Sequence, residues 1–140
     1  MASKIEHIND VNIRKTPQCI AILNSLKKNT GHPTANEILH DVTKKFPHMS
    51  LATVYNNLRK LAENDVIQEV HVKNGPSRFD KNPSTHYHMV CNKCGNMEDL
   101  SYPLLNEIES FANNLYNFVV TNHEFNLYGT CEYCQNNSEK

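Results

Sequence analysis

The chain has 140 residues, of which 39% are hydrophobic and 21% charged, as is typical of a folded protein with one ordinary domain or two small ones. Its longest apolar runs, 19–23 and 118–120, are far shorter than the roughly 20 residues of a membrane helix. Its N-terminus lacks the apolar core of a signal peptide. We therefore expect a cytoplasmic protein. Residues 1–60 hold nine Lys and Arg against four Asp and Glu (+5), whereas residues 81–140 hold three against seven (−4).

The chain is predicted to be helical up to about residue 64. Thr16, placed before a proline, is a helix start signal, and Thr34 and Ser50 are the N-caps expected for two further helices. The segment 29–31 ends the first helix, and Pro47 ends the second. Apolar residues at helical spacing are expected to form the buried faces: Ile20, Leu23 and Leu26, then Ile38, Leu39, Val42 and Phe46, then Leu51, Val54, Leu58 and Leu61.

After residue 65 the spacing of the apolar residues changes. Residues 66–72 and 77–80 predict two strands joined by a turn at 74–76. Two helices, a third helix with a polar face and a hairpin are the elements of a winged helix-turn-helix, whose recognition helix enters the major groove of DNA. The basic N-terminal half agrees with DNA binding, although ordinary solvated helix faces would give the same charge.

The polar face of the third helix supplies the residues expected to read bases, and the basic residues before the first helix are expected to contact phosphates. Each of them is also an ordinary surface residue in many proteins. The candidates for base edges are Tyr55, Asn56 and Arg59, and those for phosphates are Lys15 and Arg14.

Residues 81–85 are a predicted linker between a DNA-binding domain, residues 1–80, and a second domain, residues 86–140. The second domain is expected to be a small α+β unit, of the kind that often mediates oligomerisation. Its expected strands are 86–91, 97–100 and 118–127, and its expected helix is 104–117. That helix is predicted to pack through Leu105, Ile108, Phe111, Ala112 and Leu115.

Four of the five cysteines form two C-x-x-C pairs, Cys91 with Cys94 and Cys131 with Cys134. In a reducing cytosol such pairs indicate metal rather than disulfides, and two of them complete a tetrahedral four-thiolate site for Zn²⁺. The 36 residues between the pairs require the second pair to return from a whole intervening substructure. A redox role for one pair would need a βαβ context, which the sequence lacks. Cys19 is expected to be a small buried hydrophobe.

A second candidate metal site consists of histidine and aspartate. His86 and His88 share one face of a predicted strand because side chains alternate along it, and Asp80, Asp99 and His32 are further candidate ligands. Three nitrogens and two oxygens without a thiolate suit Fe²⁺ or Mn²⁺ better than a structural zinc. An isolated H-x-H pair, however, is also common without a metal. The other histidines outside the N-terminal segment that have no carboxylates in their company are expected at the surface: His40, His48 and His71.

Taken in order, these motifs resemble the ferric uptake regulator (Fur) family, and within it the peroxide-responsive PerR branch. The resemblance covers nearly the whole chain. It rests on residues 15–18 (Lys-Thr-Pro-Gln), 32–35 (His-Pro-Thr-Ala), 50–58 (Ser-Leu-Ala-Thr-Val-Tyr-Asn-Asn-Leu), 78–80 (Arg-Phe-Asp), 86–88 (His-Tyr-His), both C-x-x-C pairs and 127–131 (Leu-Tyr-Gly-Thr-Cys).

The resemblance implies a homodimeric repressor rather than an enzyme, with a winged-helix domain, a dimerising domain and a palindromic double-stranded operator as its partner. It implies structural Zn²⁺ on the four paired cysteines. It also implies a regulatory Fe²⁺ or Mn²⁺ on His32, Asp80, His86, His88 and Asp99. A metal held by both domains would favour one dimer geometry and so set the separation of the recognition helices.

Three positions indicate the PerR branch. Iron sensors tend to have an acidic residue where this chain has Tyr87, and Glu where it has Asp80 and Asp99. Resemblance to PerR implies that bound Fe²⁺ reacts with hydrogen peroxide and oxidises His32 and His86, which releases the DNA, whereas Mn²⁺ represses without reacting. The alternative is an iron- or manganese-level-responsive Fur-type repressor without peroxide sensing.

Two positions depart from the family's pattern. Cys19 stands where relatives often have an arginine that contacts phosphate, so DNA binding would be weaker or the contact would move to a neighbouring basic residue. His123 matches a ligand of an additional metal site in some relatives and is a further candidate ligand. Asn106 stands where the acidic partner of that site is expected, and Glu107 is adjacent.

Two other classes of function stay open at this point. A hydrolase or oxygenase using the His and Asp residues would turn over an organic substrate. A zinc-stapled dimerisation module would bind no DNA.

Overall fold

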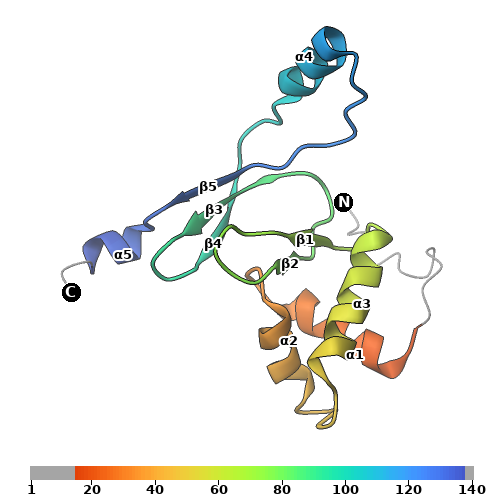
Figure 1. Ribbon diagram of the computed structural model, residues 1–140. Coiled ribbons are helices and arrows are strands. Elements are labelled where there is room, and N and C mark those ends of the chain that lie inside the picture. Colours follow the sequence, from red (N-terminus) through yellow and green to blue (C-terminus); the bar gives the residue numbers. More distant parts are fainter. Residues whose placement is uncertain (1–14, 138–140) are drawn as a thin grey trace. The chain divides into compact units, whose positions relative to one another are not determined.

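The structure, a computed structural model, describes residues 15–137 (Figure 1). The helical character expected before residue 15 and the predicted phosphate contact of Arg14 lie outside the described residues. The chain divides into two compact units, residues 1–84 and 85–140. Among residues 15–137, no helix is long and apolar enough to cross a membrane.

Two capped helices open the first unit. α1 (Pro17–Lys28) begins after Thr16, whose hydroxyl accepts a hydrogen bond from an amide of the first turn at 3.1 Å. α2 (Ala35–Val42) begins with a capping box. The Thr34 hydroxyl accepts a hydrogen bond from the Glu37 amide at 3.2 Å, and the Glu37 carboxylate accepts one from the Thr34 amide at 3.4 Å. Both predicted helix starts are confirmed.

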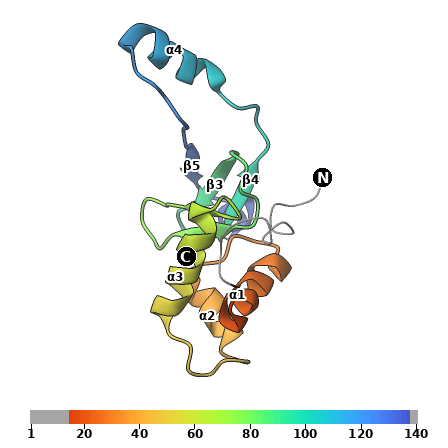
Figure 2. The same cartoon turned by 90° about the vertical axis from the view of Figure 1, so that its right-hand side faces the viewer.

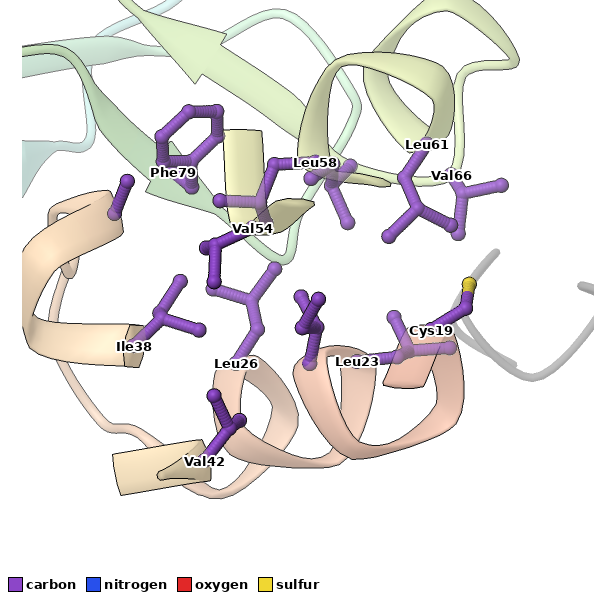
Figure 3. Close-up of a cluster of buried hydrophobic side chains, with 13 residues drawn as sticks. Cys19, Leu23, Leu26, Ile38, Val42, Val54, Leu58, Leu61, Val66 and Phe79 are labelled. Atoms are coloured by element: carbon purple, nitrogen blue, oxygen red, sulfur yellow. The ribbon is translucent and has the colours of Figure 1, made fainter. Parts of the chain in front are cut away.

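The third helix, α3 (Leu51–Glu63), begins after Ser50, which accepts a hydrogen bond from a first-turn amide, so the third predicted start is confirmed as well. The three helices pack against one another (Figure 2). Their buried side chains form one apolar core with residues of the following segment (Figure 3). The core consists of Cys19, Ile22, Leu23, Leu26, Ala35, Ile38, Val42, Val54, Leu58, Leu61, Val66, Ile67 and Phe79.

Ile20 does not belong to this core, contrary to the prediction. It is 46% exposed, whereas Ile22 is fully buried, because the buried face of α1 follows Cys19, Ile22 and Leu26 at helical spacing. Cys19 is buried, and burial raises the pKa of its thiol, which agrees with its predicted role as a small hydrophobe. The other predicted core residues that are only partly buried are Leu39, Phe46 and Leu51.

We expect Leu58→Ala to lower the free energy of unfolding by about 3 kcal/mol, because Leu58 is fully buried and its truncation leaves a cavity. Ile20→Ala is the matched control and is expected to change that free energy by less than about 1 kcal/mol, since Ile20 faces solvent. Urea unfolding followed by circular dichroism measures both values. Equal destabilisation by the two variants would contradict this assignment of the core.

A short antiparallel hairpin completes the first unit. β1 (Gln68–Val70) pairs with β2 (Arg78–Asp80). Both strands are shorter than predicted. At the start of the first strand, Val66 and Ile67 are buried in the helical core instead of pairing with the second strand. Three helices followed by a hairpin confirm the predicted winged helix-turn-helix architecture.

The second unit contains a three-stranded sheet with the order β4-β3-β5. β3 (Tyr87–Cys91) pairs antiparallel with β4 (Met97–Leu100) and parallel with β5 (Asn126–Gly129). α4 (Asn106–Tyr116) lies between β4 and β5 in the chain, and a short helix that the sequence did not predict, α5 (Glu132–Asn136), follows β5. The unit is therefore of mixed α+β type, as expected.

Helix α4 does not bury its apolar face, contrary to the prediction. Ile108, Phe111 and Leu115 are 58%, 58% and 65% exposed, while Leu105 and Ala112 are partly buried. In Figures 1 and 2, α4 lies at the end of two long connecting segments, away from the sheet of its own unit. An amphipathic pattern identifies a face that favours burial, but it does not say whether the covering surface belongs to the same chain.

The last strand is also shorter than predicted. Residues 118–125 return from α4 to the sheet without forming a strand, and β5 starts only at Asn126. The apolar residues that suggested a strand are exposed at Phe118 and Val119. They therefore do not belong to the sheet.

Candidate metal centres

The four paired cysteines lie together at one end of the sheet in the second unit. Cys91 ends β3, Cys94 follows in a turn, Cys131 follows β5, and Cys134 lies on α5. The parallel pairing of β3 with β5 places Cys91 opposite Gly129 and so closes the 36-residue gap between the pairs. The four Sγ atoms all lie within 4.8 Å of one another.

Backbone amides stabilise the thiolate form of one cysteine in this cluster, and a thiolate is the form that binds a metal. Cys91 Sγ accepts hydrogen bonds from the amides of Cys131 at 3.4 Å and Cys94 at 3.5 Å, and these bonds lower the pKa of the Cys91 thiol to about 6. Desolvation raises the pKa of the Cys134 thiol to about 12, and hydrogen bonds with neighbouring thiols add to the effect. Four close sulfurs fit the closed tetrahedral coordination of structural Zn²⁺. A bound zinc would deprotonate the remaining thiols and contribute to folding.

The first unit holds two of the predicted regulatory ligands. His32 Nε2 lies 3.2 Å from Asp80 Oδ2, and both side chains are largely buried. The Arg78 guanidinium donates a hydrogen bond to the His32 carbonyl at 3.0 Å, and the Phe79 amide donates one to the Pro33 carbonyl at 2.9 Å. These bonds fix the segment before α2 to β2, so the imidazole and the carboxylate face each other.

The beginning of the predicted linker is held in place as well. Asp80 Oδ1 accepts a hydrogen bond from the Asn82 amide at 2.9 Å, while the other carboxylate oxygen faces the histidine. The Lys81 ammonium donates to the carbonyls of Lys27 at 3.2 Å and Asn29 at 3.1 Å, at the C-terminal end of α1. The linker therefore begins as a fixed part of the first unit.

The second unit holds the other three predicted ligands. His86 Nε2 and His88 Nε2 lie 3.3 Å and 3.5 Å from the same oxygen of Asp99, and the two imidazole centroids are 4.4 Å apart. His88 is opposite Asp99 in the pairing of β3 with β4, and alternation along the chain places His86 on the same face. The His88 side chain is 3% exposed and that of Asp99 is 55% exposed, so the histidine is buried and the carboxylate is accessible to solvent.

By donor type, the two groups supply three imidazoles and two carboxylates without a thiolate. This set fits Fe²⁺ or Mn²⁺, as predicted, and differs from the all-sulfur zinc cluster. These donor types suit such an ion, and a bound Fe²⁺ would supply redox chemistry. The histidines predicted to be at the surface are indeed exposed: His40, His48 and His71.

His123 contacts Tyr87, which points to the opposite face of β3 from the two ligand histidines. Its Nε2 lies 2.5 Å from the Tyr87 hydroxyl, and its Nδ1 forms a hydrogen bond with Glu109. The carboxylate that contacts His123 therefore lies at position 109, and not at position 106 or 107. Helical spacing is the signal that could have found it, because Glu109 is one turn after Asn106 on the same face of α4, whereas Glu107 is not.

The predicted DNA-contact residues lie on α3 and just before α1. Asn56 and Arg59 are exposed, Tyr55 is half-buried, and Lys15 is exposed. The Arg59 guanidinium lies 4.8 Å from the centre of the Tyr55 ring. Its Nε is 4.0 Å from Oε1 of Glu69 on β1, a contact that sequence reasoning missed. The exposed face of α3 thus offers polar side chains of the types that read base edges.

The model of the ferric uptake regulator family matches residues 10–128. The chain belongs to this family. The Fur-family resemblance predicted from the motifs is thereby confirmed. The peroxide-responsive repressor PerR of Staphylococcus aureus is 42% identical to this chain over 135 residues, which cover 96% of this chain and 91% of that protein.

Solved Fur-family structures resemble the chain as well. The crystal structure of the Campylobacter jejuni peroxide stress regulator is 34% identical, with a TM-score of 0.68, and the match covers 84% of this chain and 89% of that one. The Helicobacter pylori ferric uptake regulator Fur, at 20% identity, has a TM-score of 0.74 over 93% of this chain and 87% of that one. At that identity the likeness shows the shared fold.

Proposed function

We propose that this Fur-family protein is a metal-dependent repressor of transcription that releases DNA when hydrogen peroxide oxidises its own histidine ligands. The observation that carries the proposal is the pair of thiolate-free ligand groups, His32 with Asp80 in the first unit and His86 and His88 with Asp99 in the second. The 42% identity to a protein named peroxide-responsive repressor supports the same function.

The two ligand groups are proposed to bind one Fe²⁺ or Mn²⁺ ion together. Neither group alone offers enough donors to fill the coordination shell that these ions prefer. Because one group belongs to each unit, an ion held by both would select the arrangement in which the five ligands converge. An operator that prefers the same arrangement must tighten metal binding by the same factor as the metal tightens DNA binding.

DNA recognition is assigned to the exposed face of α3. Tyr55, Asn56 and Arg59 would contact base edges, and Lys15 would contact a phosphate. A second copy of the chain would present the same helix in the opposite orientation, so the expected operator is a palindromic double-stranded site. The function requires no turnover of a substrate, and it places the protein in the cytoplasm together with the chromosome.

Dimerisation is assigned to the apolar surface around α4. Eight large apolar residues between positions 102 and 119 are exposed, and contiguous exposed apolar surfaces mark protein interfaces. A second copy of the same chain covers it in the proposal. Its exposed members are Tyr102, Leu104, Ile108, Phe111, Leu115, Tyr116, Phe118 and Val119.

We expect Phe111→Glu to raise the dimer dissociation constant by about 100-fold, because the substitution places an unpaired charge at the centre of an apolar interface. Ser110→Glu adds the same charge at the neighbouring exposed position and is the matched control. Sedimentation velocity over a concentration series measures both constants. If the two variants dimerise equally well, α4 is not the dimer contact.

The proposed response to peroxide is a self-oxidation of the ligands. Bound Fe²⁺ would activate the peroxide for reaction with a neighbouring ligand, whereas Mn²⁺ on the same ligands would not react. Overall, the imidazole ring of His32 or His86 loses two electrons and gains one oxygen atom at a ring carbon, while the peroxide gains those two electrons and its second oxygen leaves as water. An oxidised imidazole no longer completes its ligand group, so the metal-selected arrangement and the DNA complex are lost.

DNA binding to genomic fragments selected with the Mn²⁺-loaded protein tests this function. Fluorescence anisotropy is expected to show binding by the Mn²⁺ and Fe²⁺ forms, and peroxide is expected to release DNA only from the Fe²⁺ form. An Fe²⁺ form that keeps its DNA after peroxide would favour the second candidate, an iron- or manganese-level-responsive repressor. The donor set supports this candidate too, because it suits both ions. DNA binding that needs no metal would contradict both.

A further inference from the structure

The face of β3 opposite the ligand histidines carries a hydrogen-bond chain that includes none of the five proposed metal ligands. The Leu105 amide donates to the Tyr87 hydroxyl at 2.7 Å, and this hydroxyl lies 2.5 Å from His123 Nε2. His123 Nδ1 in turn forms a hydrogen bond with Glu109. Tyr87 is 1% exposed, and the side chains of His123 and Glu109 are 16% and 27% exposed. Buried polar groups that are hydrogen-bonded to one another can hold segments in a fixed arrangement.

The donors and acceptors of this hydrogen-bond chain can all be paired without a bound cation. The Tyr87 hydroxyl accepts a hydrogen bond from the Leu105 amide, so its single proton is available to His123 Nε2, which acts as the acceptor. The ring proton of a neutral His123 then lies on Nδ1 and is donated to the Glu109 carboxylate. Both ring nitrogens of His123 are therefore in use.

These hydrogen bonds connect segments of the second unit that the sheet does not connect. Glu109 lies on α4 and Leu105 directly precedes it, His123 lies on the segment that returns from α4, and Tyr87 lies in the central strand β3. On the same returning segment, Phe125 contacts the Tyr87 ring edge-on at 5.5 Å between centroids. Since α4 itself buries no residue, these contacts tie it and its two connecting segments to the sheet.

We infer that Tyr87, His123 and Glu109 form a hydrogen-bonded anchor that positions the α4 arm on the strand of the ligand histidines, and that they are not a third metal site. The α4 arm is α4 with its connecting segments, residues 101–125. Tyr87 lies between His86 and His88 in the chain, so a displaced arm shifts the backbone that both ligands share. The anchor thereby couples the dimer surface to the regulatory metal, an inference that rests on the proposed function for both roles.

Four variants of the full-length, zinc-loaded protein separate the anchor from a metal site. Tyr87→Phe removes the hydroxyl and keeps the ring. Glu109→Ala removes the acceptor of the Nδ1 proton, whereas Glu109→Gln keeps an acceptor oxygen but is a poor metal ligand. Glu107→Ala removes an exposed carboxylate from the same helix and is the matched control.

Two readouts are needed. Amide hydrogen exchange at Leu105 reports the anchor directly, and titration with Mn²⁺ reports its coupling to the regulatory ligands. We expect Tyr87→Phe and Glu109→Ala to speed Leu105 exchange and to weaken Mn²⁺ binding roughly tenfold, because each leaves buried polar groups without their partners. Glu109→Gln and Glu107→Ala are expected to stay within about twofold of the wild type.

Several outcomes would overturn the inference. Unchanged Leu105 exchange in Tyr87→Phe would refute the anchor, and faster exchange with unchanged Mn²⁺ affinity would refute its coupling to the metal. A wild-type protein that binds an additional equivalent of Mn²⁺ or Zn²⁺, lost alike in Glu109→Gln and Glu109→Ala, would establish a metal site instead. Failure of the proposed function has a different signature: the wild type binds no Mn²⁺, while Tyr87→Phe still speeds Leu105 exchange.

Discussion

A His88→Ala variant is expected to lose metal-dependent DNA binding, with its Mn²⁺ affinity lowered by at least about 100-fold. Removal of a residue that only supports a ligand costs about 10–100-fold in affinity, and removal of the ligand itself costs more. The His88 imidazole is buried and lies 3.5 Å from Asp99 Oδ1, so no other side chain replaces it without a change of the strand. Calorimetric titration with Mn²⁺ and anisotropy with operator DNA measure the two losses.

Burial of His88 makes a second variant necessary, because its truncation also leaves a cavity. Asp99→Asn keeps the size of an exposed side chain and removes a charged donor, so it is expected to weaken Mn²⁺ binding without a change in thermal stability. His40→Ala, at an exposed histidine of α2, is the control. Wild-type Mn²⁺ affinity in both His88→Ala and Asp99→Asn would contradict the assigned ligands.

Cys131→Ser is expected to lose zinc and, with it, the folded second unit. Zn²⁺ binding to four thiolates supplies on the order of 10 kcal/mol to the folding of small zinc domains, and the described core of this unit is modest because α4 buries no residue. Zinc content by atomic absorption and thermal unfolding by circular dichroism measure the effect. We expect less than one zinc per ten chains and loss of the dimer.

The matched control for this variant is Cys19→Ala, which removes the one cysteine outside the cluster. It is expected to keep its zinc and its dimer, with the small loss of stability that truncation of a buried thiol brings. A zinc-free Cys131→Ser protein that unfolds at the wild-type temperature would show that the cluster has no structural role.

Local signals in the sequence predicted the first unit well. The caps at Thr16, Thr34 and Ser50 are satisfied by amides within the following turn, so each depends only on its neighbours in the chain. The zinc ligands were equally predictable, because a C-x-x-C pair brings two sulfurs together by local geometry. The change from helical to strand spacing after residue 65 located the hairpin for the same reason.

Features that depend on distant partners were predicted poorly. The sequence of α4 shows an apolar face, but nothing in it says that this face stays exposed within one chain. The partner of His123 was missed because it required the helical phase of α4 relative to a segment that comes later in the chain. The hydrogen bond from Arg78 that fixes the His32 segment spans 46 residues, and the one from Lys81 that fixes the start of the linker spans 54. Neither contact has a periodic signal in the sequence.

Oxidation of the histidine ligands is measured most directly by peptide mass spectrometry. Protein loaded with Fe²⁺ under anaerobic conditions is treated with about one equivalent of hydrogen peroxide and compared with a Mn²⁺-loaded sample. We predict the addition of one oxygen atom to His32 or His86 in the Fe²⁺ form and none in the Mn²⁺ form. Unmodified histidines with oxidation confined to the cysteines would contradict peroxide sensing through the ligands, and the protein would then respond to the level of the metal itself.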